Sequence, residues 1–423
     1  VALVAHDEHE PLRRLLVAVV CGVQTAVRVA PSRGGCFRII TPGARGRGFT
    51  SGPGATPSMS RSTERRSTSA DAPRVVVVDD SPFMRQLIGD ILTDAGVAVV
   101  GEAGDGAAAL SVIETTRPDV VTMDVEMPGV GGIEAVERVM ATVPTPILML
   151  SAHTADGTDA TFEALERGAV DVFTKPGGEV SAGVSRDADR LAAAVRSVAT
   201  ADLDAMSTAS RPPAADATDD STPRPPSTKP GSSPEDLDAP LTVVVGASTG
   251  GPKAVERVLA ALPAADCRVL VVQHMPAGFT ARFATRLDEA CAYEVREAGD
   301  GDRIGAGEAL VAPGSAHLVV DSYRAGRLRV RLREPADTGV TPAVDVTMRT
   351  AAAAVDDPLV GVVLTGMGDD GAAGIRAMAA AGAHTIAQSR DSCVVYGMPK
   401  RAVETGAVDD VRDLDDVADA IFG

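Results

Sequence analysis

Ser248 has the surroundings that most directly suggest chemistry, because it lies in Gly-Ala-Ser-Thr-Gly-Gly, residues 246–251. The pattern G-x-S-x-G places a serine on a sharp turn between a strand and a helix, where its hydroxyl can act as a nucleophile. From the residues alone, a phosphate-binding loop and an ordinary turn stay open as alternatives. The phosphate-loop pattern G-x-x-x-x-G-K-S/T fits poorly, because Lys253 comes one position late and Ala254 replaces the magnesium-binding hydroxyl.

A serine nucleophile needs a base, and the base needs a group that orients it. His274 follows an apolar run and the acidic pair Asp369 and Asp370 follows another, whereas His317 precedes such a run and His384 begins one. If the runs are parallel strands, the residues that follow them share one edge of the sheet, which favours His274 as the base. Either acid could orient it. The order Ser, His, Asp differs from the orders of α/β-hydrolases and of two protease families.

Carboxylates also follow apolar runs in the first half of the chain. Asp79 and Asp80 come after one run and Asp124 after another, so parallel strands would bring the three together. Clustered carboxylates repel one another unless a cation neutralises them, and such a set of oxygen ligands suits Mg²⁺. Ser151 and Lys175 end two further runs, and their hydroxyl and ammonium groups would bind a phosphoryl group. We therefore expect Asp124 to form an aspartyl phosphate.

Short runs rich in β-branched residues alternate with helix-like segments through the first half of the chain. Five runs are expected as strands, at residues 74–80, 97–103, 118–124, 145–151 and 169–175. Residues 83–92 and 132–140 carry apolar side chains at helical spacing, and residues 187–198 are expected as the last helix. This alternation predicts an α/β domain with a parallel, doubly wound sheet.

The second half of the chain resumes this alternation after an interruption. Residues 207–240 are rich in Pro, Ser, Thr and Asp and nearly free of large apolar side chains, so we expect a flexible linker over residues 201–239. Beyond it, a helix is expected at residues 252–263, with one apolar face. Strands are expected at residues 241–248, 267–274, 307–313, 327–333, 359–367 and 384–388. Residues 240–423 are therefore expected to form a second α/β domain with a mainly parallel sheet.

The composition limits the classes of partner. The chain of 423 residues has 58 Asp and Glu against 40 Lys and Arg, a net charge of −18. Such an excess of acid argues against nucleic-acid binding, because phosphates would be repelled, and it indicates a halophilic source. Five cysteines without a CxxC pair predict neither a zinc site nor a disulfide framework. No stretch approaches the about 20 apolar residues of a membrane helix, so we expect no direct membrane insertion.

The first 58 residues differ from the rest, because they carry seven arginines and only three acids. Residues 13–27 combine paired arginines with a short apolar core, as signal peptides do. We favour a different interpretation, in which Met59 is the natural start of the protein. Residues 1–72 are then expected to be a disordered or wrongly assigned extension, and residues 1–58 to have no structural role.

The stretches VVDDSPFMR, DVVTMDVEMPGVGG, LSAHT and FTKP, between residues 73 and 200, are similar to those of the receiver domain of response regulators. This resemblance implies a flavodoxin-like domain in which Asp124 receives phosphate from the histidine of a kinase. It implies Mg²⁺ as the cofactor, held by Asp79, Asp80, Asp124 and the carbonyl of Glu126. Ser151 and Phe173 would be the hydroxyl and the aromatic ring that shift on phosphorylation, beside the phosphoryl-binding Lys175.

The stretches VVVGASTGG, VVQHMPAGFTARFATRLD, LVAPGSAH, TPAVDVTM, VVLTGMGDDG and VVYGMPKRA cover nearly all of residues 240–410. They resemble the motifs of the CheB family, the chemotaxis protein-glutamate methylesterases, and imply a Rossmann-like catalytic domain. By this resemblance Ser248 is the nucleophile, His274 the general base and acid, and Asp370, rather than Asp369, the orienting carboxylate.

Two backbone amides are expected to stabilise the developing oxyanion. The amide of Thr249 lies at the start of the helix that follows the serine, where free N–H groups and a positive potential are available. The resemblance implies the amide of Met367 as the second donor. Thr341 departs from the family, in which we expect arginine before Pro342, and this departure affects the expected substrate contacts rather than the three catalytic residues.

The resemblance implies a serine hydrolase that cleaves glutamate γ-methyl esters on the cytoplasmic helices of chemoreceptors and releases methanol. The same site would deamidate glutamine side chains, and no cofactor is expected for either reaction. The receiver would pack across the catalytic cleft until a chemotaxis histidine kinase phosphorylates it. The alternative is a phosphorylation-dependent adaptor that binds receptors without hydrolysing anything. In both cases the protein is expected in the cytoplasm.

Overall fold

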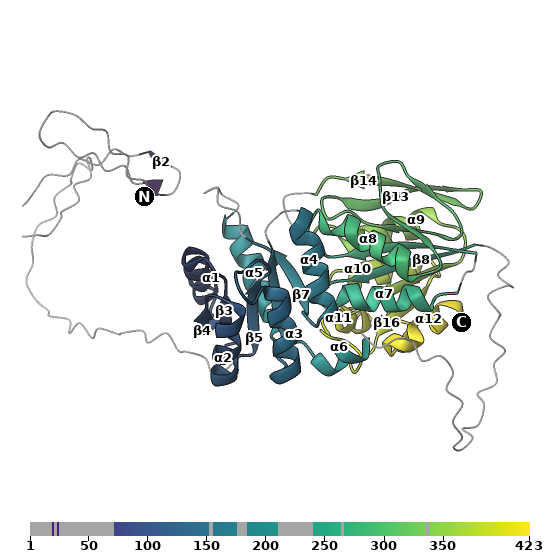
Figure 1. The fold of residues 1–423 in the computed structure, drawn as a ribbon. Helices are drawn as coiled ribbons and strands as arrows, with labels where there is room; N and C mark the ends of the chain where they lie inside the picture. Colours follow the sequence, from purple (N-terminus) through teal and green to yellow (C-terminus); the bar gives the residue numbers. More distant parts are fainter. Residues whose placement is uncertain are drawn as a thin grey trace, which may run out of the picture. The chain divides into compact units, whose positions relative to one another are not determined.

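The computed structural model describes residues 72–151, 155–175, 184–209, 240–263, 266–335 and 339–423, together with the short strands β1 (Val19–Val20) and β2 (Val23–Gln24). The chain divides into two compact units, Val1–Ser67 and Thr68–Gly423. In the first unit β1 and β2 pair antiparallel. The prediction for residues 1–72 otherwise falls almost entirely outside the described residues. Both predicted α/β domains belong to the second unit (Figure 1).

The N-terminal domain is built on a parallel sheet with strand order β4-β3-β5-β6-β7. Its strands are β3 (Arg74–Val78), β4 (Ala98–Ala103), β5 (Val120–Asp124), β6 (Ile147–Ser151) and β7 (Asp171–Thr174). Its helices are α1 (Pro82–Asp94), α2 (Gly106–Thr116), α3 (Gly132–Thr142), α4 (Ala155–Glu166) and α5 (Val184–Val198). Strand β3 is almost entirely valine because both of its faces are buried. Val75 and Val77 pack with residues of α1 and α5, and Val76 and Val78 with residues of α2 and α3.

The C-terminal domain is built on a parallel sheet with strand order β10-β12-β9-β8-β15-β16-β17. Its strands are β8 (Leu241–Ala247), β9 (Cys267–Gln273), β10 (Glu294–Glu297), β12 (Glu308–Val311), β15 (Leu359–Val363), β16 (His384–Gln388) and β17 (Asp410–Arg412). Its helices are α7 (Gly251–Ala261), α8 (Phe279–Ala290), α9 (Val344–Ala354), α10 (Ala372–Ala380), α11 (Met398–Glu404), the 3₁₀ helix η2 (Leu414–Asp416) and α12 (Val417–Phe422). The α/β fold class predicted for both domains is confirmed.

A smaller antiparallel sheet adds to the second domain, with strand order β11-β14-β13. Its strands are β11 (Arg303–Ile304), β13 (His317–Arg324) and β14 (Arg327–Arg333). The alternating sequence of β14 was predicted as a half-exposed strand, and Leu328 and Val330 are buried while Arg327 and Arg331 are exposed. The apolar run that follows His317 was not included among the predicted strands, although it forms most of β13, which pairs antiparallel with β14 over nearly its whole length.

Helix α6 (Leu203–Ala209) lies inside the segment that was predicted as a linker from residue 201. It is ordered because Ala205 and Met206 are buried, and because the amide of Asp202 donates a hydrogen bond of 2.9 Å to the carbonyl of Val394. The residues near the start of the predicted linker, which begins at residue 201, therefore belong to a helix. Within the described part of the chain, every helix is too short or too polar to cross a bilayer.

Candidate active site

The residues predicted to hydrolyse an ester follow three neighbouring strands, in the order β9-β8-β15 across the sheet. The register pairs Ala247 with Gln273, so Ser248 and His274 are the next residues on two adjacent strands. The amide of His274 also donates a 3.0 Å hydrogen bond to the carbonyl of Ala247. From β8 the sheet extends to β9 on one side and to β15 on the other, and such a switch point is where open α/β sheets bind ligands.

His274 and Asp370 are in direct contact. The imidazole Nε2 lies 2.8 Å from Oδ2 of Asp370, and the backbone amides of Val344 and Asp345 donate to the same carboxylate at 2.7 and 2.9 Å. Burial alone would raise the pKa of Asp370, but the contact with His274 and the two amides hold that pKa below its usual value. The carboxylate is therefore an anion suited to orient an imidazole. Asp369, its neighbour, is exposed.

Several contacts fix the loop that carries Ser248. The amide of Ser248 donates a 3.0 Å hydrogen bond to the carbonyl of Thr365. The side-chain amide of Gln273 donates to the carbonyls of both Ser248 and His274, at 2.8 and 3.1 Å. Gly366 lies so close that a Cβ there would be 2.6 Å from the Cβ of Ser248. The serine backbone is therefore held by the strand ends on both sides of β8.

The two predicted oxyanion donors have free amides. Thr249 is buried, and its carbonyl accepts a 3.0 Å hydrogen bond from the hydroxyl of Thr365. Met367 is 39 % exposed. Among the described residues, neither the Thr249 amide nor the Met367 amide has a hydrogen-bond acceptor. An oxyanion hole needs such unoccupied donors, so both amides stay available for it.

The two rival histidines have other environments. His317 begins β13, and its Nδ1 accepts a 3.1 Å hydrogen bond from the amide of Ala343. Burial, and secondarily the charge of Arg333, lowers the pKa of His317. His384 is the first residue of β16, so it lies at the amino-terminal end of the parallel strands, whereas the candidate site lies at their carboxyl ends. Its Nε2 is 3.3 Å from the carboxylate of Asp410.

The acids predicted in the first domain meet at the edge of the five-stranded sheet. Asp79, Asp80 and Asp124 each offer a carboxylate oxygen, and these oxygens lie within 4.8 Å of one another. Lys175 lies between two of them, with its Nζ 2.8 Å from Asp79 and 2.7 Å from Asp124. Oxygen ligands of this number and charge fit Mg²⁺, which binds few carboxylates and keeps its other positions for water and phosphate.

The surroundings shift the pKa values of Asp124 and Lys175 in this cluster. Burial raises the pKa of Asp124, although Lys175 opposes the shift. The pKa of Lys175 is raised too, because its contacts with Asp124 and Asp79 outweigh the effect of its burial. The amide of Glu126 donates a 3.3 Å hydrogen bond to Asp124, so its backbone adjoins the cluster. Ser151 ends β6 and is buried, and Phe173 in β7 is partly buried with the guanidinium of Arg190 6.0 Å from its ring centre.

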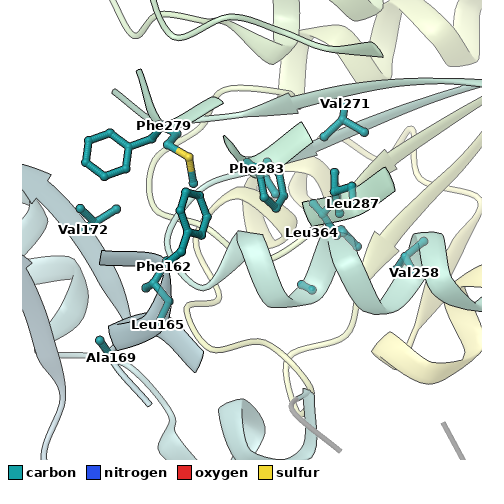
Figure 2. Packing of buried hydrophobic residues seen from close by; sticks show 14 of the residues in the cluster. Phe162, Leu165, Ala169, Val172, Val258, Val271, Phe279, Phe283, Leu287 and Leu364 are labelled. Atoms are coloured by element: carbon teal, nitrogen blue, oxygen red, sulfur yellow. The ribbon is translucent and has the colours of Figure 1, made fainter. Parts of the chain in front are cut away.

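The two domains touch through an aromatic cluster. Phe162 in α4 stacks on Phe283 in α8, with ring centres 6.3 Å apart and an angle of 6° between the rings, and it also lies 6.4 Å from Phe279 (Figure 2). Ion pairs flank this cluster: Arg282 contacts Asp159 at 2.6 Å, and Arg286 contacts Glu166.

Two polar residues of the N-terminal domain reach the candidate active site. The hydroxyl of Ser197 in α5 donates a 3.1 Å hydrogen bond to the hydroxyl of Thr249. Asp171, at the start of β7, has its pKa raised to about 6 by burial, while contacts with the Val172 amide and Thr249 and the charge of His274 oppose the shift. The N-terminal domain thus adjoins both the predicted base, His274, and one predicted oxyanion donor, Thr249.

Sequence reasoning missed several residues that support the site. Gln273 carried a usable signal, because it is a polar residue inside a fully buried strand and precedes His274. Gly366 lies in VVLTGMGDDG and Asp345 in TPAVDVTM, but nothing in their spacing indicates which residues they contact. Asp171 and Ser197 reach the site only through the contact between domains, which has no local sequence pattern.

Comparison with known proteins finds two family models in this chain. Residues 243–421 match the family described as CheB methylesterase, and residues 75–181 match the response regulator receiver domain. A protein-glutamate methylesterase/protein-glutamine glutaminase of Haloarcula marismortui is 56 % identical over 367 residues, which cover 84 % of this chain and 98 % of the relative. A protein of the same name from Natronomonas pharaonis is 53 % identical over 349 residues, covering 82 % and 96 %. The crystal structure of the Thermotoga maritima CheB methylesterase catalytic domain is 36 % identical, covering 44 % of this chain and 98 % of its own, with a TM-score of 0.42.

Proposed function

The chain belongs to the CheB methylesterase family, and on this premise we propose that it hydrolyses glutamate γ-methyl esters on chemoreceptors, with its receiver domain as the phosphorylation-dependent switch. The proposed substrate lies on the cytoplasmic helices of the receptors, so the reaction takes place in the cytoplasm. The observation that carries the proposal is the 2.8 Å contact between His274 and Asp370 at the strand end next to Ser248.

In the proposed mechanism Ser248 attacks the carbonyl carbon of the ester while His274 takes its proton. Because Nε2 of His274 is bonded to Asp370, the other ring nitrogen, Nδ1, is the one that accepts this proton. The negative charge then develops on the former carbonyl oxygen, where the amides of Thr249 and Met367 stabilise it. When the C–O bond to the methoxy group breaks, His274 returns the proton and methanol leaves.

Water completes the reaction on the acyl-enzyme. His274 takes a proton from the water as its oxygen attacks the acyl carbon, and then returns a proton to Ser248 as the serine leaves. The product is a glutamate carboxylate. Deamidation of a glutamine follows the same path, with ammonia in place of methanol, because an amide passes through the same tetrahedral oxyanion.

Asp124 is the proposed acceptor of the phosphoryl group from the histidine of the chemotaxis kinase. One of its carboxylate oxygens bonds to phosphorus as the bond between phosphorus and the histidine nitrogen breaks. Asp79, Asp80, Asp124 and the carbonyl of Glu126 would hold Mg²⁺, which when bound supplies positive charge for the carboxylates and the phosphoryl oxygens. Lys175 contributes the same kind of charge from the protein, and Ser151 a hydroxyl donor.

The proposed control acts through the contacts between the domains. In the unphosphorylated protein, Phe162 and Ser197 hold the receiver against α8 and Thr249, where it limits access to the site. Phosphorylation of Asp124 shifts Ser151 and Phe173 and loosens this face of the receiver. Hydrolysis then increases because a receptor helix can reach Ser248.

The test is release of methanol from receptor-containing membranes whose glutamates carry tritiated methyl esters. We expect the full-length protein, with Mg²⁺ and a small-molecule phosphodonor, to release methanol, and Ser248→Ala to lower the rate at least about 1,000-fold. Asp369→Ala is the matched control, because it removes an exposed carboxylate beside Asp370 and should retain the activity. Receptor binding without methanol release by the wild-type protein would overturn the proposal and support the adaptor alternative.

A further inference from the structure

The carboxylates of Asp345 and Asp370 form reciprocal hydrogen bonds with the first turns of α10 and α9. Asp370, just before α10, accepts hydrogen bonds from the Val344 and Asp345 amides at the start of α9, at 2.7 and 2.9 Å. In return, Oδ1 of Asp345 accepts hydrogen bonds from the Gly371 and Gly374 amides at the start of α10, at 2.9 and 2.6 Å. Each acid therefore caps the helix at whose start the other acid lies.

This exchange is favourable because the first amides of a helix have no acceptor within the helix and carry a positive potential. It also has a cost, since both acids are partly buried and close together. Burial raises the pKa of the Asp345 carboxyl, the hydrogen bonds from the two amides lower it, and the charge of the nearby Asp370 raises it. The net effect is a raised pKa. The four hydrogen bonds hold the two helix starts in one fixed relation. Only Asp370 also contacts His274.

We infer that Asp345 is a positioning residue for the hydrolysis: by bonding the amides of Gly371 and Gly374, it fixes the loop that presents the Asp370 carboxylate to His274. The inference rests on the proposed function. The loop needs an external support, because Gly368 and Gly371 have φ values of +94° and +96° and give the backbone much freedom. Asp345 supplies that support from a different helix, without touching the imidazole itself.

Two substitutions of Asp345 separate a positioning role from a general effect of its charge. Asp345→Asn removes the charge but keeps an oxygen that can accept the two amide hydrogen bonds. Asp345→Ala removes both the charge and the acceptor. If position is what matters, the asparagine variant keeps most of the activity and the alanine variant does not. If charge is what matters, the two variants lose activity equally.

The kinetic test measures methanol release by the full-length variants with saturating phosphodonor. Because a displacement of about 1 Å in a catalytic group can cost about 100-fold in rate, we expect Asp345→Ala to lower kcat by about 10- to 100-fold with little change in KM. Asp345→Asn should stay within a few-fold of the wild type. Asp369→Ala, an exposed acid on the same loop, is the control. Equal kcat values for wild type and Asp345→Ala would overturn the inference.

A second readout does not depend on activity. The ring N–H of His274 that is bonded to Asp370 should give a low-field proton resonance, which the His274→Gln variant identifies by its loss. We expect this resonance to weaken or move upfield in Asp345→Ala and to persist in Asp345→Asn. A resonance that persists unchanged in a less stable Asp345→Ala protein would mean that Asp345 has a structural role only. Failure of the proposed function is recognised separately, because the wild-type protein would then release no methanol.

Discussion

The hydroxyl of Ser197, in α5 of the receiver, donates a 3.1 Å hydrogen bond to the hydroxyl of Thr249, the residue next to Ser248. This contact joins the end of the receiver's last helix to the loop expected to form the oxyanion hole. Thr249 is only 4 % exposed in this arrangement of the two domains. A movement of α5 would therefore break or lengthen a hydrogen bond to the residue next to Ser248.

Phe162→Ala is expected to raise the activity of the unphosphorylated protein. Phe162 packs against Phe279 and Phe283 of the catalytic domain, and truncating a buried phenylalanine typically costs about 3–5 kcal/mol of packing free energy. Part of this loss weakens the contact between the domains, so a larger fraction of the protein has the receiver moved away from the site. Methanol release without phosphodonor should increase several-fold, while the rate with phosphodonor changes little.

Phe83→Ala is the control for this prediction. Phe83 is also in the receiver, but it is 71 % exposed on α1 and its removal costs little packing. Circular dichroism would establish that both variants are folded. A folded Phe162→Ala protein with wild-type activity in the absence of phosphodonor would show that these rings do not restrain the enzyme.

Asp171 makes the stability of the folded protein depend on pH. Burial raises its pKa to about 6 from an ordinary value of 3.8, so the folded state binds this proton more tightly than the unfolded state. The protonated form stabilises the fold at low pH, and this stability is lost as the pH rises from about 4 to about 6. Asp171→Asn, which stays neutral, should therefore raise Tm more at pH 8 than at pH 5.

Thermal unfolding at several pH values would check this expectation. Asp189→Asn serves as the control, because Asp189 is an exposed carboxylate on α5. Its effect on Tm should vary much less between pH 5 and pH 8. If the Asp171→Asn variant differed from the wild type by the same Tm at both pH values, the carboxyl group would not titrate in this range.

The sequence was informative wherever a strand ends in a polar residue. Ser248, His274 and Asp124 follow or end buried apolar strands, so their shared sheet edges could be predicted from parallel pairing alone. Helix α7 was equally clear, because Val255, Val258, Leu259 and Leu262 recur at helical spacing and all are buried. In these cases the local pattern and the tertiary fold depend on the same apolar face.

Contacts between distant segments could not be predicted in this way. The capping of α10 by Asp345 depends on where two helices start relative to each other, and nothing in either segment records that relation. The contact of Ser197 with Thr249 depends on how two whole domains pack. Helix α6 was missed for a similar reason, since Met206 is buried against other segments and directly precedes the residues whose composition indicates a linker.

Asp124→Asn should have low activity that does not respond to a phosphodonor. The amide cannot accept a phosphoryl group, and it also removes one of the two carboxylates that contact Lys175. Methanol release with and without the phosphodonor would be compared for wild type and variant, and Asp119→Asn would be the control in the same domain. Equal stimulation of the Asp124→Asn and wild-type proteins would exclude Asp124 as the regulatory acceptor.

Gly366→Ala should strongly lower the activity of the enzyme while leaving it folded. The backbone of Gly366 is not in the left-handed region, so alanine is permitted there, but its Cβ would lie 2.6 Å from both the Cβ of Ser248 and the sulfur of Met398. Met398 is flexible enough to adjust, whereas Ser248 presents its Cβ and its backbone nitrogen, which would be 2.6 and 2.9 Å from the new Cβ and cannot rotate away, so the loop that carries the serine has to shift. We expect kcat to fall by about 100-fold, as for other small displacements of a catalytic group.

Gly299→Ala is the matched control in the same domain, because its nearest neighbour, the Asp302 carboxylate, is at an ordinary 3.4 Å. A Gly366→Ala protein with wild-type kcat would mean that Ser248 tolerates a shift of this size, and that its attack does not depend on the close packing of this loop.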